Sequence, residues 1–565
     1  MNEIISTDVL VIGGGAAGIR AAIEANDNGA DVLLVVKGKF AKTGSSFFSL
    51  VHGWGIQAVF KDTNLDDSTE KHLEEILEAG LGMCDVKLAR ILVEEAPQRV
   101  MDLERYGIEF KKENGEFVQQ VGCFSKKPRA IAASDMKNIR STFRNEIIKR
   151  NIKVLENTMV FDLLTINNTC VGALCIKDNG DIIAIKAKST ILATGGASTI
   201  FKNNLNSPEL TGDGQIMAIN AGAELLNMEF IQFIYGIVYP KKLLFAERVL
   251  EFCPKIYNRH NELYLEGYLP DSLEYEEVLK DRAKHGPFSS RSISKYFDIA
   301  TYKEIMKRNC SEHGGVYIDL SAISNNKKME KYPFTKDWIR WLFSQGIDPN
   351  SQILEIAPHA HAFNGGVRVN ERAETKVKGL FAAGEIIGGP HGADRLGGNM
   401  MSLTQVFGAR AGKYAAIRSK KIKEIPWNEE SIKRKYSSIT KLTKAKNGIK
   451  PDKIDEEIKR LMWENVAICR NEKGLSKCIE KLEEIGNKYI PNIAAGNIKE
   501  LKQAISVRNK LTLSKIIANS ALIRKESRGS HYREDFPDID NNEFNKCIIV
   551  EKEGEKILYK LESVN

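Results

Sequence analysis

The feature that most constrains the fold is a glycine-rich turn near the start of the chain. A strand, a helix and a second strand are predicted in succession over residues 7–12, 19–25 and 31–36. Between the first strand and the helix, the spacing G-x-G-x-x-G is satisfied by Gly13, Gly15 and Gly18. In such a unit the glycines allow a tight turn, approach of the backbone to a pyrophosphate, and close packing of helix on strand. The sequence therefore predicts a dinucleotide-binding domain of the Rossmann type.

The end of the second strand narrows the choice of dinucleotide. NAD-binding domains usually place an acid there to hold the ribose hydroxyls. Here the strand ends in Val36-Lys37, which argues against ordinary NAD use.

Two later strand-to-glycine elements favour FAD over NAD. Residues 189–196 run from an apolar strand into Thr194-Gly195-Gly196, and residues 377–385 run from another strand into Gly384-Glu385. Three such elements in this order are typical of flavoproteins with two dinucleotide-type motifs. We expect Glu385 to hold the ribityl chain of FAD.

Composition and cysteine spacing exclude several classes of protein. Of 565 residues, 42% are hydrophobic and 28% are charged, as in ordinary globular proteins. The apolar runs are strand-sized, so we expect no membrane anchor, and the N-terminus lacks a secretory pattern. The nine cysteines form no CxxC or zinc-type spacing, which predicts a cytoplasmic chain with reduced thiols, no metal site and no iron–sulfur cluster of its own.

The formal net charge of +8 is interpreted as a mildly basic surface. Lysines alternate with glutamates over residues 433–459 and 473–502, as on solvated helix faces. No platform of aromatic and basic residues is evident, so we expect no nucleic-acid partner. A weaker alternative is that the excess charge attracts an acidic redox protein.

The pattern along the chain predicts an α/β fold: a Rossmann-type FAD-binding domain, an inserted α+β capping domain and a C-terminal helical bundle. The expected boundaries are FAD-binding 1–235, capping 236–349, FAD-binding 350–425, helical 426–540 and a small strand pair 541–565.

Several motifs together resemble one family of flavoproteins. These motifs are residues 211–214 (TGDG), 229–233 (EFIQF), 363–367 (FNGGV), 391–396 (HGADRL), Met462-Trp463 and 524–536 (RKESRGSHYREDF). They resemble the flavoprotein subunit of succinate dehydrogenase and fumarate reductase, a family that includes L-aspartate oxidase. The resemblance implies FAD, a mobile cap, and a reaction that interconverts saturated and unsaturated C–C or C–N bonds next to a carboxylate.

The resemblance also implies three catalytic residues. Arg291 falls where the family has the catalytic arginine of its cap, but Ser292 follows it where the family usually has Asp, so a binding role is safer than proton transfer. His361 stands at the substrate-histidine spacing before Gly365-Gly366. Its neighbour His359 is better explained as a satisfied buried imidazole. Arg395 matches the arginine that grips a carboxylate through a planar fork.

The cofactor contacts follow from the glycine elements and from the resemblance. We expect the helix that starts at Asn399 to point its N-terminus at the flavin, and Asp213 to hold adenosine or flavin-side groups. Ser45-Ser46 stand where succinate dehydrogenases attach FAD to a histidine, so non-covalent FAD is predicted, although His52 lies in the same loop. The full predicted set is Gly13, Gly15, Ala16, Ala17, Gly18, Lys37, Ser45, Ser46, Thr194, Gly195, Asp213, Glu385, Arg395, Asn399, Met400 and Met401.

Two departures from the family concern the substrate. The family's Gln-Phe-His is Gln232-Phe233-Ile234 here, and Phe245-Ala246 stand near the place of its Thr-Glu. Both contacts serve the second carboxylate of a dicarboxylic acid, which would be costly to bury unpaired. We therefore expect a substrate with one carboxylate and an apolar or larger other end.

The resulting hypothesis is an FAD-dependent reductase or dehydrogenase of a small carboxylate, fed by a separate electron-transfer protein that is ferredoxin-like or an iron–sulfur subunit. Two alternatives stay open: an amino-acid oxidase like L-aspartate oxidase, and a non-catalytic electron-transfer subunit.

Overall fold

The computed structural model describes residues 3–48, 50, 53–60, 66–321, 323, 331–440, 442 and 448–564. His52 lies outside these residues. The largest sheet has the strand order β8-β2-β1-β11-β10-β9, with β19 also paired to β11. Its strands are β1 (Glu3–Ile12), β2 (Val32–Val35), β8 (Lys153–Leu155), β9 (Thr158–Ile166), β10 (Thr169–Lys177), β11 (Ile182–Leu192) and β19 (Leu380–Ala382).

All three predicted glycine elements follow parallel strands of this sheet. β1 lies between β2 and β11 and is parallel to both, and β19 is parallel to β11. The carboxyl ends of β1, β11 and β19 therefore meet at one edge, where ligands bind in open α/β sheets. The apolar runs of β1 and β2 are buried, as expected of strands that are covered on both faces.

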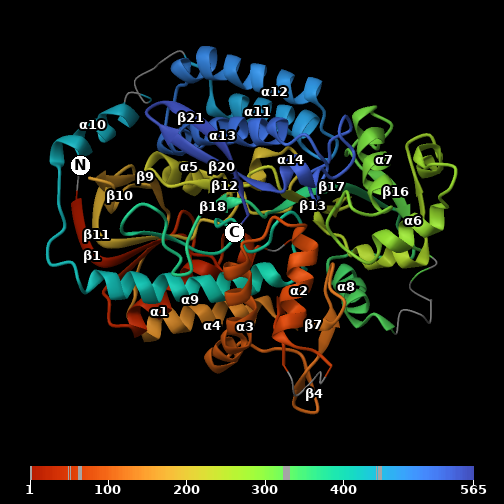
Figure 1. Cartoon of the computed structure of the whole chain (residues 1–565), viewed down its shortest axis with the longest axis horizontal. Coiled ribbons are helices and arrows are strands. Elements are labelled where there is room, and N and C mark those ends of the chain that lie inside the picture. The colour runs from red at the N-terminus through yellow and green to blue at the C-terminus, as the bar shows by residue number, and fades with distance from the viewer. Residues whose placement is uncertain are drawn as a thin grey trace.

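Helices α1 (Ala16–Asp27) and α9 (Asn399–Ser419) lie side by side against this sheet (Figure 1). Small residues permit the contact: a Cβ atom at Gly412 would lie 2.3 Å from the carbonyl oxygen of Ala21. The segment between β2 and β8 adds α2 (Thr69–Gly80), α3 (Val86–Tyr106), α4 (Met136–Lys149), and the short strands β3 (Trp54–Gln57), β4 (Lys112–Glu113), β5 (Glu116–Phe117), β6 (Gln119–Val121) and β7 (Pro128–Ala133).

A second sheet, with the order β14-β13-β17-β16-β15, carries its own hydrophobic core. Its strands are β13 (Ile231–Tyr239), β14 (Leu243–Leu244), β15 (Lys255–Tyr257), β16 (Val316–Asp319) and β17 (Leu354–Phe363), accompanied by α6 (Tyr275–Arg282), α7 (Lys295–Met306) and α8 (Pro333–Ser344). β13 and β17 pair along their length; β13 crosses the boundary predicted after position 235, and β17 lies entirely after the boundary predicted at position 349. The predicted limits of the capping domain stay predictions.

The C-terminal region is helical, as predicted. α11 (Pro451–Val466) and α12 (Glu472–Glu484) pack on α13 (Ile498–Ile523), and the three helices stack at the top of Figure 1. The remaining elements are α5 (Asp213–Asn220), α10 (Glu429–Thr440), α14 (Asn541–Phe544), β12 (Leu225–Leu226), β18 (Gly366–Val367), β20 (Lys546–Glu553) and β21 (Lys556–Ser563). The hairpin β20–β21 turns at Gly554, whose φ of +61° suits glycine.

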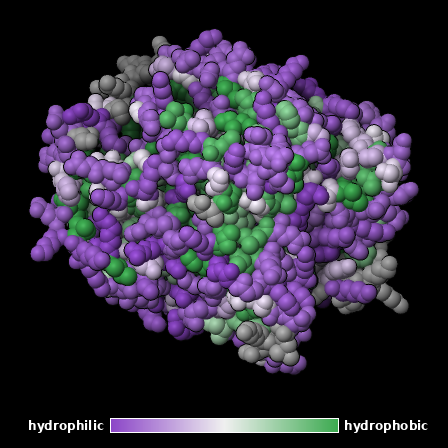
Figure 2. Space-filling model, viewed as in Figure 1, coloured by the Kyte–Doolittle hydropathy of each residue, from purple (hydrophilic) through white to green (hydrophobic). Residues whose placement is uncertain are grey.

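The face seen in Figure 2 is mainly hydrophilic, with a band of hydrophobic residues through its centre. Among the described residues, no helix combines the length and the apolar character that crossing a bilayer requires.

Candidate functional site

One cavity of about 550 Å³ runs from the glycine-rich turn after β1 to the second sheet. The predicted site residues that line it are Gly13, Gly15, Ala16, Ala17, Lys37, Ser45, Ser46, Thr194, Gly195, Asp213, His361, Glu385, Arg395, Met400 and Met401. Gly18, Arg291 and Asn399 were also predicted, but they do not belong to the lining. Segments that are far apart in the sequence thus converge on one site.

At one end of the cavity, the glycine-rich turn leaves a helix N-terminus uncovered. Gly13 has a φ of +113°, and a Cβ atom there would lie 2.2 Å from the carbonyl oxygen of Ala193. Gly18 has a packing role, since a Cβ atom on it would lie 1.8 Å from the carbonyl oxygen of Gly13. Gly15 is the N-cap residue of α1, and no side chain caps the helix there. This end of the cavity therefore suits a pyrophosphate.

Lys37 forms an ion pair with an acid from a distant part of the chain. Its Nζ lies 2.9 Å from Oδ2 of Asp213 at the start of α5. Asp213 also accepts hydrogen bonds from Thr211, Ser506 and Asn509 over 2.6, 2.9 and 2.8 Å. Burial opposes ionisation, but Lys37 and these donors hold the pKa of Asp213 below its ordinary value. Lys37 at the end of β2 is thus paired with an acid at the start of α5.

A second uncapped helix start faces the other part of the cavity. α9 begins after Gly398, whose φ is +91° and which offers no side-chain cap. Met400 and Met401 of its first turn line the cavity, whereas Asn399 turns away and lies 3.2 Å from Nε2 of His72. The positive end of this helix would stabilise negative charge on a bound ring.

Glu385 and Thr194 lie between these two helix starts. Burial raises the pKa of Glu385 to about 7, although it accepts a hydrogen bond from the amide of Phe363 over 3.1 Å. The hydroxyl of Thr194 is buried in the cavity wall without a partner among the described residues. Two uncapped helix starts, a carboxyl and an unsatisfied hydroxyl in one elongated cavity fit the phosphates and the polyol chain of FAD.

Arg395 brings a buried positive charge into the cavity. Its Nε donates to Oε1 of Gln232 over 3.1 Å, and its Nη1 donates to the carbonyl of Leu396 over 3.0 Å. It makes no ion pair with any carboxylate in the described part of the chain, and burial lowers its pKa. A buried unpaired guanidinium favours binding of an anion.

His361 faces the same cavity from β17. Burial, assisted by the charge of Arg395, lowers its pKa to about 3, so the imidazole is neutral. Its Nδ1 has no partner in the described residues. Its carbonyl accepts from Asn206 over 2.6 Å, and Asn206 in turn accepts from Ser45 over 2.8 Å. His359 bonds the carbonyl of Ala357 on its own strand over 2.8 Å, in line with its structural interpretation.

Arg291 is held beside the cavity rather than in its lining. Its guanidinium carbon lies 4.3 Å from the ring centre of Phe124, and its Nε lies 4.0 Å from Oδ2 of Asp394. The side chain is 25% exposed. Ser292, which follows it, bonds the hydroxyl of Ser294 over 2.6 Å.

Glu247 and Cys123 are among the lining residues that sequence reasoning missed. Glu247 starts a short 3₁₀ helix (Glu247–Phe252), and burial raises its pKa to about 7. Its Oε1 accepts from the amide of Tyr235 over 3.2 Å. Cys123 lines the cavity nearby, and its Sγ accepts from the amide of Gly286 over 3.1 Å. Glu247 directly follows Phe245-Ala246, which stand near the place of the family's Thr-Glu, so the cavity holds an acid beside these two residues.

Apolar side chains line the cavity near these groups. Ile234 of β13 contributes to the lining where the family has a histidine, together with Leu205, Leu244 and Phe334. None of the four side chains can pair a second carboxylate.

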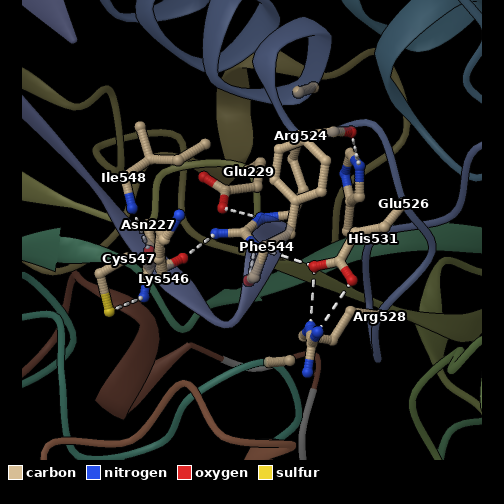
Figure 3. Close-up of polar contacts among 12 residues, drawn as sticks. Asn227, Glu229, Arg524, Glu526, Arg528, His531, Phe544, Lys546, Cys547 and Ile548 are labelled. Atoms are coloured by element: carbon tan, nitrogen blue, oxygen red, sulfur yellow. Dashed lines mark hydrogen bonds and ion pairs between the residues drawn. The ribbon is translucent and has the colours of Figure 1, made fainter. Parts of the chain in front are cut away.

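The specific motif at 524–536 builds a buried ionic cluster (Figure 3). Arg524 donates to Glu229 over 2.7 Å and to Glu526 over 2.9 Å, and Glu526 also binds Arg528. The following residues support the Arg395 segment, because the hydroxyl of Ser530 donates to the carbonyl of Ala393 over 2.8 Å. This motif therefore positions the site from outside the cavity.

The cavity and the sheet order fit a protein that binds FAD, and the comparisons identify an FAD-dependent oxidoreductase. An FAD binding domain matches residues 8–250 and 300–401, and the fumarate reductase flavoprotein C-terminal domain matches residues 455–565. The chain belongs to the family of the flavoprotein subunits of succinate dehydrogenase and fumarate reductase.

Relatives along the whole chain support this assignment. An uncharacterised FAD-dependent oxidoreductase of Methanocaldococcus jannaschii is 35% identical, with 98% of each chain covered. One subunit of the CoM/CoB fumarate reductase of Methanothermobacter marburgensis is 34% identical, again with 98% of each covered. L-aspartate oxidases also match. Among solved structures, Sdh1 of Mycobacterium smegmatis with UQ1 superposes with a TM-score of 0.87 at 28% identity, covering 100% of this chain and 95% of that one.

Proposed function

We propose that the protein transfers hydride between FAD and a carbon next to a carboxylate-activated C=C or C=N bond, in a substrate with one carboxylate and an apolar end. The observation that carries the proposal is Arg395, a buried guanidinium without an ion pair in the described structure, beside the neutral imidazole of His361. Both side chains line the cavity that suits FAD.

Bound FAD supplies hydride exchange at its ring. During reduction of an enoate, negative charge develops on the α-carbon and spreads into the carboxylate. Arg395 stabilises this charge more in the transition state than in the ground state, and His361 donates a hydrogen bond to the same group. Arg291 is a further carboxylate ligand in this proposal, reaching the substrate from beside Phe124.

A proton must reach the α-carbon as the hydride arrives. Glu247 is the proposed donor, because its carboxyl lines the cavity and a pKa of about 7 keeps much of it protonated at neutral pH. His361 is a poor candidate, because its pKa of about 3 leaves the imidazole without the extra proton at neutral pH.

The apolar end of the substrate would contact the wall of Ile234, Leu205, Leu244 and Phe334. A second carboxylate placed there would lose its hydration without gaining a donor. Substrates with an alkyl or aryl group at this end are therefore preferred in this proposal.

Electrons would reach or leave the flavin through a separate protein, ferredoxin-like or an iron–sulfur subunit. Two observations support this part of the proposal. The cysteines of the chain have no cluster-binding spacing, and the CoM/CoB fumarate reductase relative is named as one subunit of its enzyme.

The test is reoxidation of the reduced flavin. The purified holoprotein is photoreduced without oxygen and mixed with mono- and dicarboxylic enoates and imines, while the flavin absorbance is followed. Fast reoxidation by an aryl- or alkyl-substituted acrylate supports the proposal, whereas preference for fumarate refutes its substrate part. Peroxide formed with L-aspartate would favour the oxidase alternative, and no response to any acid would favour a non-catalytic electron-transfer role.

A further inference from the structure

The loop that contains Cys123 and Phe124, in the FAD-binding region, contacts residues 285–291 of the predicted cap. The ring of Phe124 stacks on His285, with centroids 4.6 Å apart and an interplanar angle of 19°. The guanidinium carbon of Arg291 lies 4.3 Å from the centre of the same ring. One aromatic side chain of the loop thus contacts both ends of this segment.

Hydrogen bonds between the same two segments surround this aromatic contact. Cys123, next to Phe124, accepts from Gly286 through its Sγ over 3.1 Å. Its carbonyl accepts from the amide of Gly397 over 2.9 Å. The loop therefore bonds both the segment 285–291 and the segment that leads into α9, where cofactor and substrate would meet.

The segment 285–291 is also fastened next to Arg395. The hydroxyl of Ser289 donates to Oδ2 of Asp394 over 2.6 Å, and the amide of Ser290 donates to the carbonyl of Gly529 over 2.7 Å. Asp394 is fully buried, and its Oδ1 has no hydrogen-bond partner in the described residues. The charge nearest to this carboxylate is Arg291, whose Nε is 4.0 Å from Oδ2.

We propose that Phe124 and Asp394 are positioning residues that together latch the segment 285–291 over the substrate end of the cavity, with Arg291 as the residue held by the latch. Phe124 binds the guanidinium through its ring face, a contact worth more when it is shielded from water. Asp394 supplies the opposing charge and the acceptor for Ser289. Substrate entry then requires these contacts to separate, so the latch regulates access to the substrate end of the cavity. This role rests on the proposed function.

Accessibility of Cys123 to a thiol reagent tests the latch without turnover. The FAD-loaded protein is treated with N-ethylmaleimide in a background of C253S and C310S, and modification of Cys123 is followed by mass spectrometry. We expect R291Q and D394N to raise the labelling rate at least about tenfold, since one side of the latch is lost. R340Q, a substitution of an exposed arginine on α8, is the matched control and should label at the wild-type rate.

Substitutions of Phe124 separate the role of the ring from its bulk. F124L keeps an apolar side chain but removes the aromatic face, and should also raise labelling about tenfold. F124W keeps the face and should restore slow labelling. Unchanged labelling in R291Q and F124L, with FAD content and near-ultraviolet circular dichroism as in the wild type, overturns the latch.

Kinetics of the same variants separate the latch from the proposed function. A loosened latch raises the KM for the acid and changes kcat by less than about threefold in D394N. Failure of the proposed function would instead appear as an inactive wild type, which leaves the labelling result intact. Equal losses of kcat and kcat/KM in D394N, with wild-type labelling, would refute the positioning role.

Discussion

The guanidinium of Arg395 donates to the amide oxygen of Gln232 over 3.1 Å, so its buried charge is oriented by a neutral partner. A carboxylate in place of Gln232 would neutralise the arginine and compete with an acidic substrate. The amide orients the fork and leaves its charge available to a ligand. This pair is the basis of the first prediction.

Replacing Arg395 with Lys should lower kcat/KM for the acid at least about 100-fold, because an ammonium group cannot grip a carboxylate through two parallel bonds. Steady-state kinetics of the FAD-loaded variant measure the effect. Q232E should weaken the enzyme in the same direction by pairing the arginine internally. Wild-type kcat/KM in both variants would remove Arg395 from the site.

Replacing Ile234 with His should shift selectivity toward dicarboxylic acids. The imidazole would offer a donor to a second carboxylate, and a hydrogen bond to a charged group is worth about 1.5–3 kcal/mol. We expect the ratio of kcat/KM for fumarate to that for an apolar acrylate to rise at least about tenfold. I234L keeps an apolar wall and serves as the control. An unchanged ratio in I234H would contradict the assignment of Ile234 to the substrate wall.

The proton donor can be identified from the pH dependence of reduction. Glu247 must be protonated to donate, so kcat should fall as the pH rises through about 7. E247Q should lower kcat and abolish this fall of kcat with rising pH. Burial also raises the pKa of Glu385 to about 7, so E385Q is the necessary comparison. E385Q should weaken FAD binding but keep the fall of kcat with rising pH. If kcat still falls with rising pH in E247Q, Glu247 is not the donor.

The sequence predicted the FAD region well because its signals are local. Gly13 and Gly18 are required by contacts within one β-α-β unit, so their spacing alone reveals the turn. Arg395 and His361 both line the cavity, and their catalytic roles stay predictions.

The parts that sequence reasoning missed depend on contacts between distant segments. Glu247 and Cys123 lie 124 residues apart by their numbering, yet a Cβ atom on Gly286 would lie 3.3 Å from the Sγ of Cys123 and 3.4 Å from Oε2 of Glu247. The pairing of Lys37 with Asp213 likewise spans 176 residues. The position of Arg291 beside the cavity depends on Phe124 and Asp394, which no local pattern connects to it.

The attachment of FAD is predicted to be non-covalent. Ser45 and Ser46 line the cavity beside the first turn of α1, and the described part of this loop contains no histidine. Precipitation of the purified protein with acid should therefore leave the yellow colour in the supernatant. A yellow pellet would contradict the prediction, and H52A would then show whether His52 is the attachment point.

The buried cluster around Glu526 should contribute strongly to stability. Glu526 pairs with both Arg524 and Arg528, and all three side chains are almost fully shielded from water. E526Q would leave the buried guanidinium of Arg528 without an acid and would leave Arg524 with Glu229 alone. Breaking a buried ion pair costs about 3–5 kcal/mol. We expect a clear fall in the urea midpoint of the FAD-loaded protein, measured by tryptophan fluorescence and by flavin release.

Glu484 provides the control for this experiment. It pairs with Lys481 and Lys488 on the surface of the helical region, where water screens the charges. E484Q should leave the urea midpoint unchanged. Since Ser530 in the same motif bonds the carbonyl of Ala393, E526Q should also raise the KM for the acid under conditions where the protein is still folded. Loss of stability without any change in KM would show that the cluster supports the fold but not the position of Arg395.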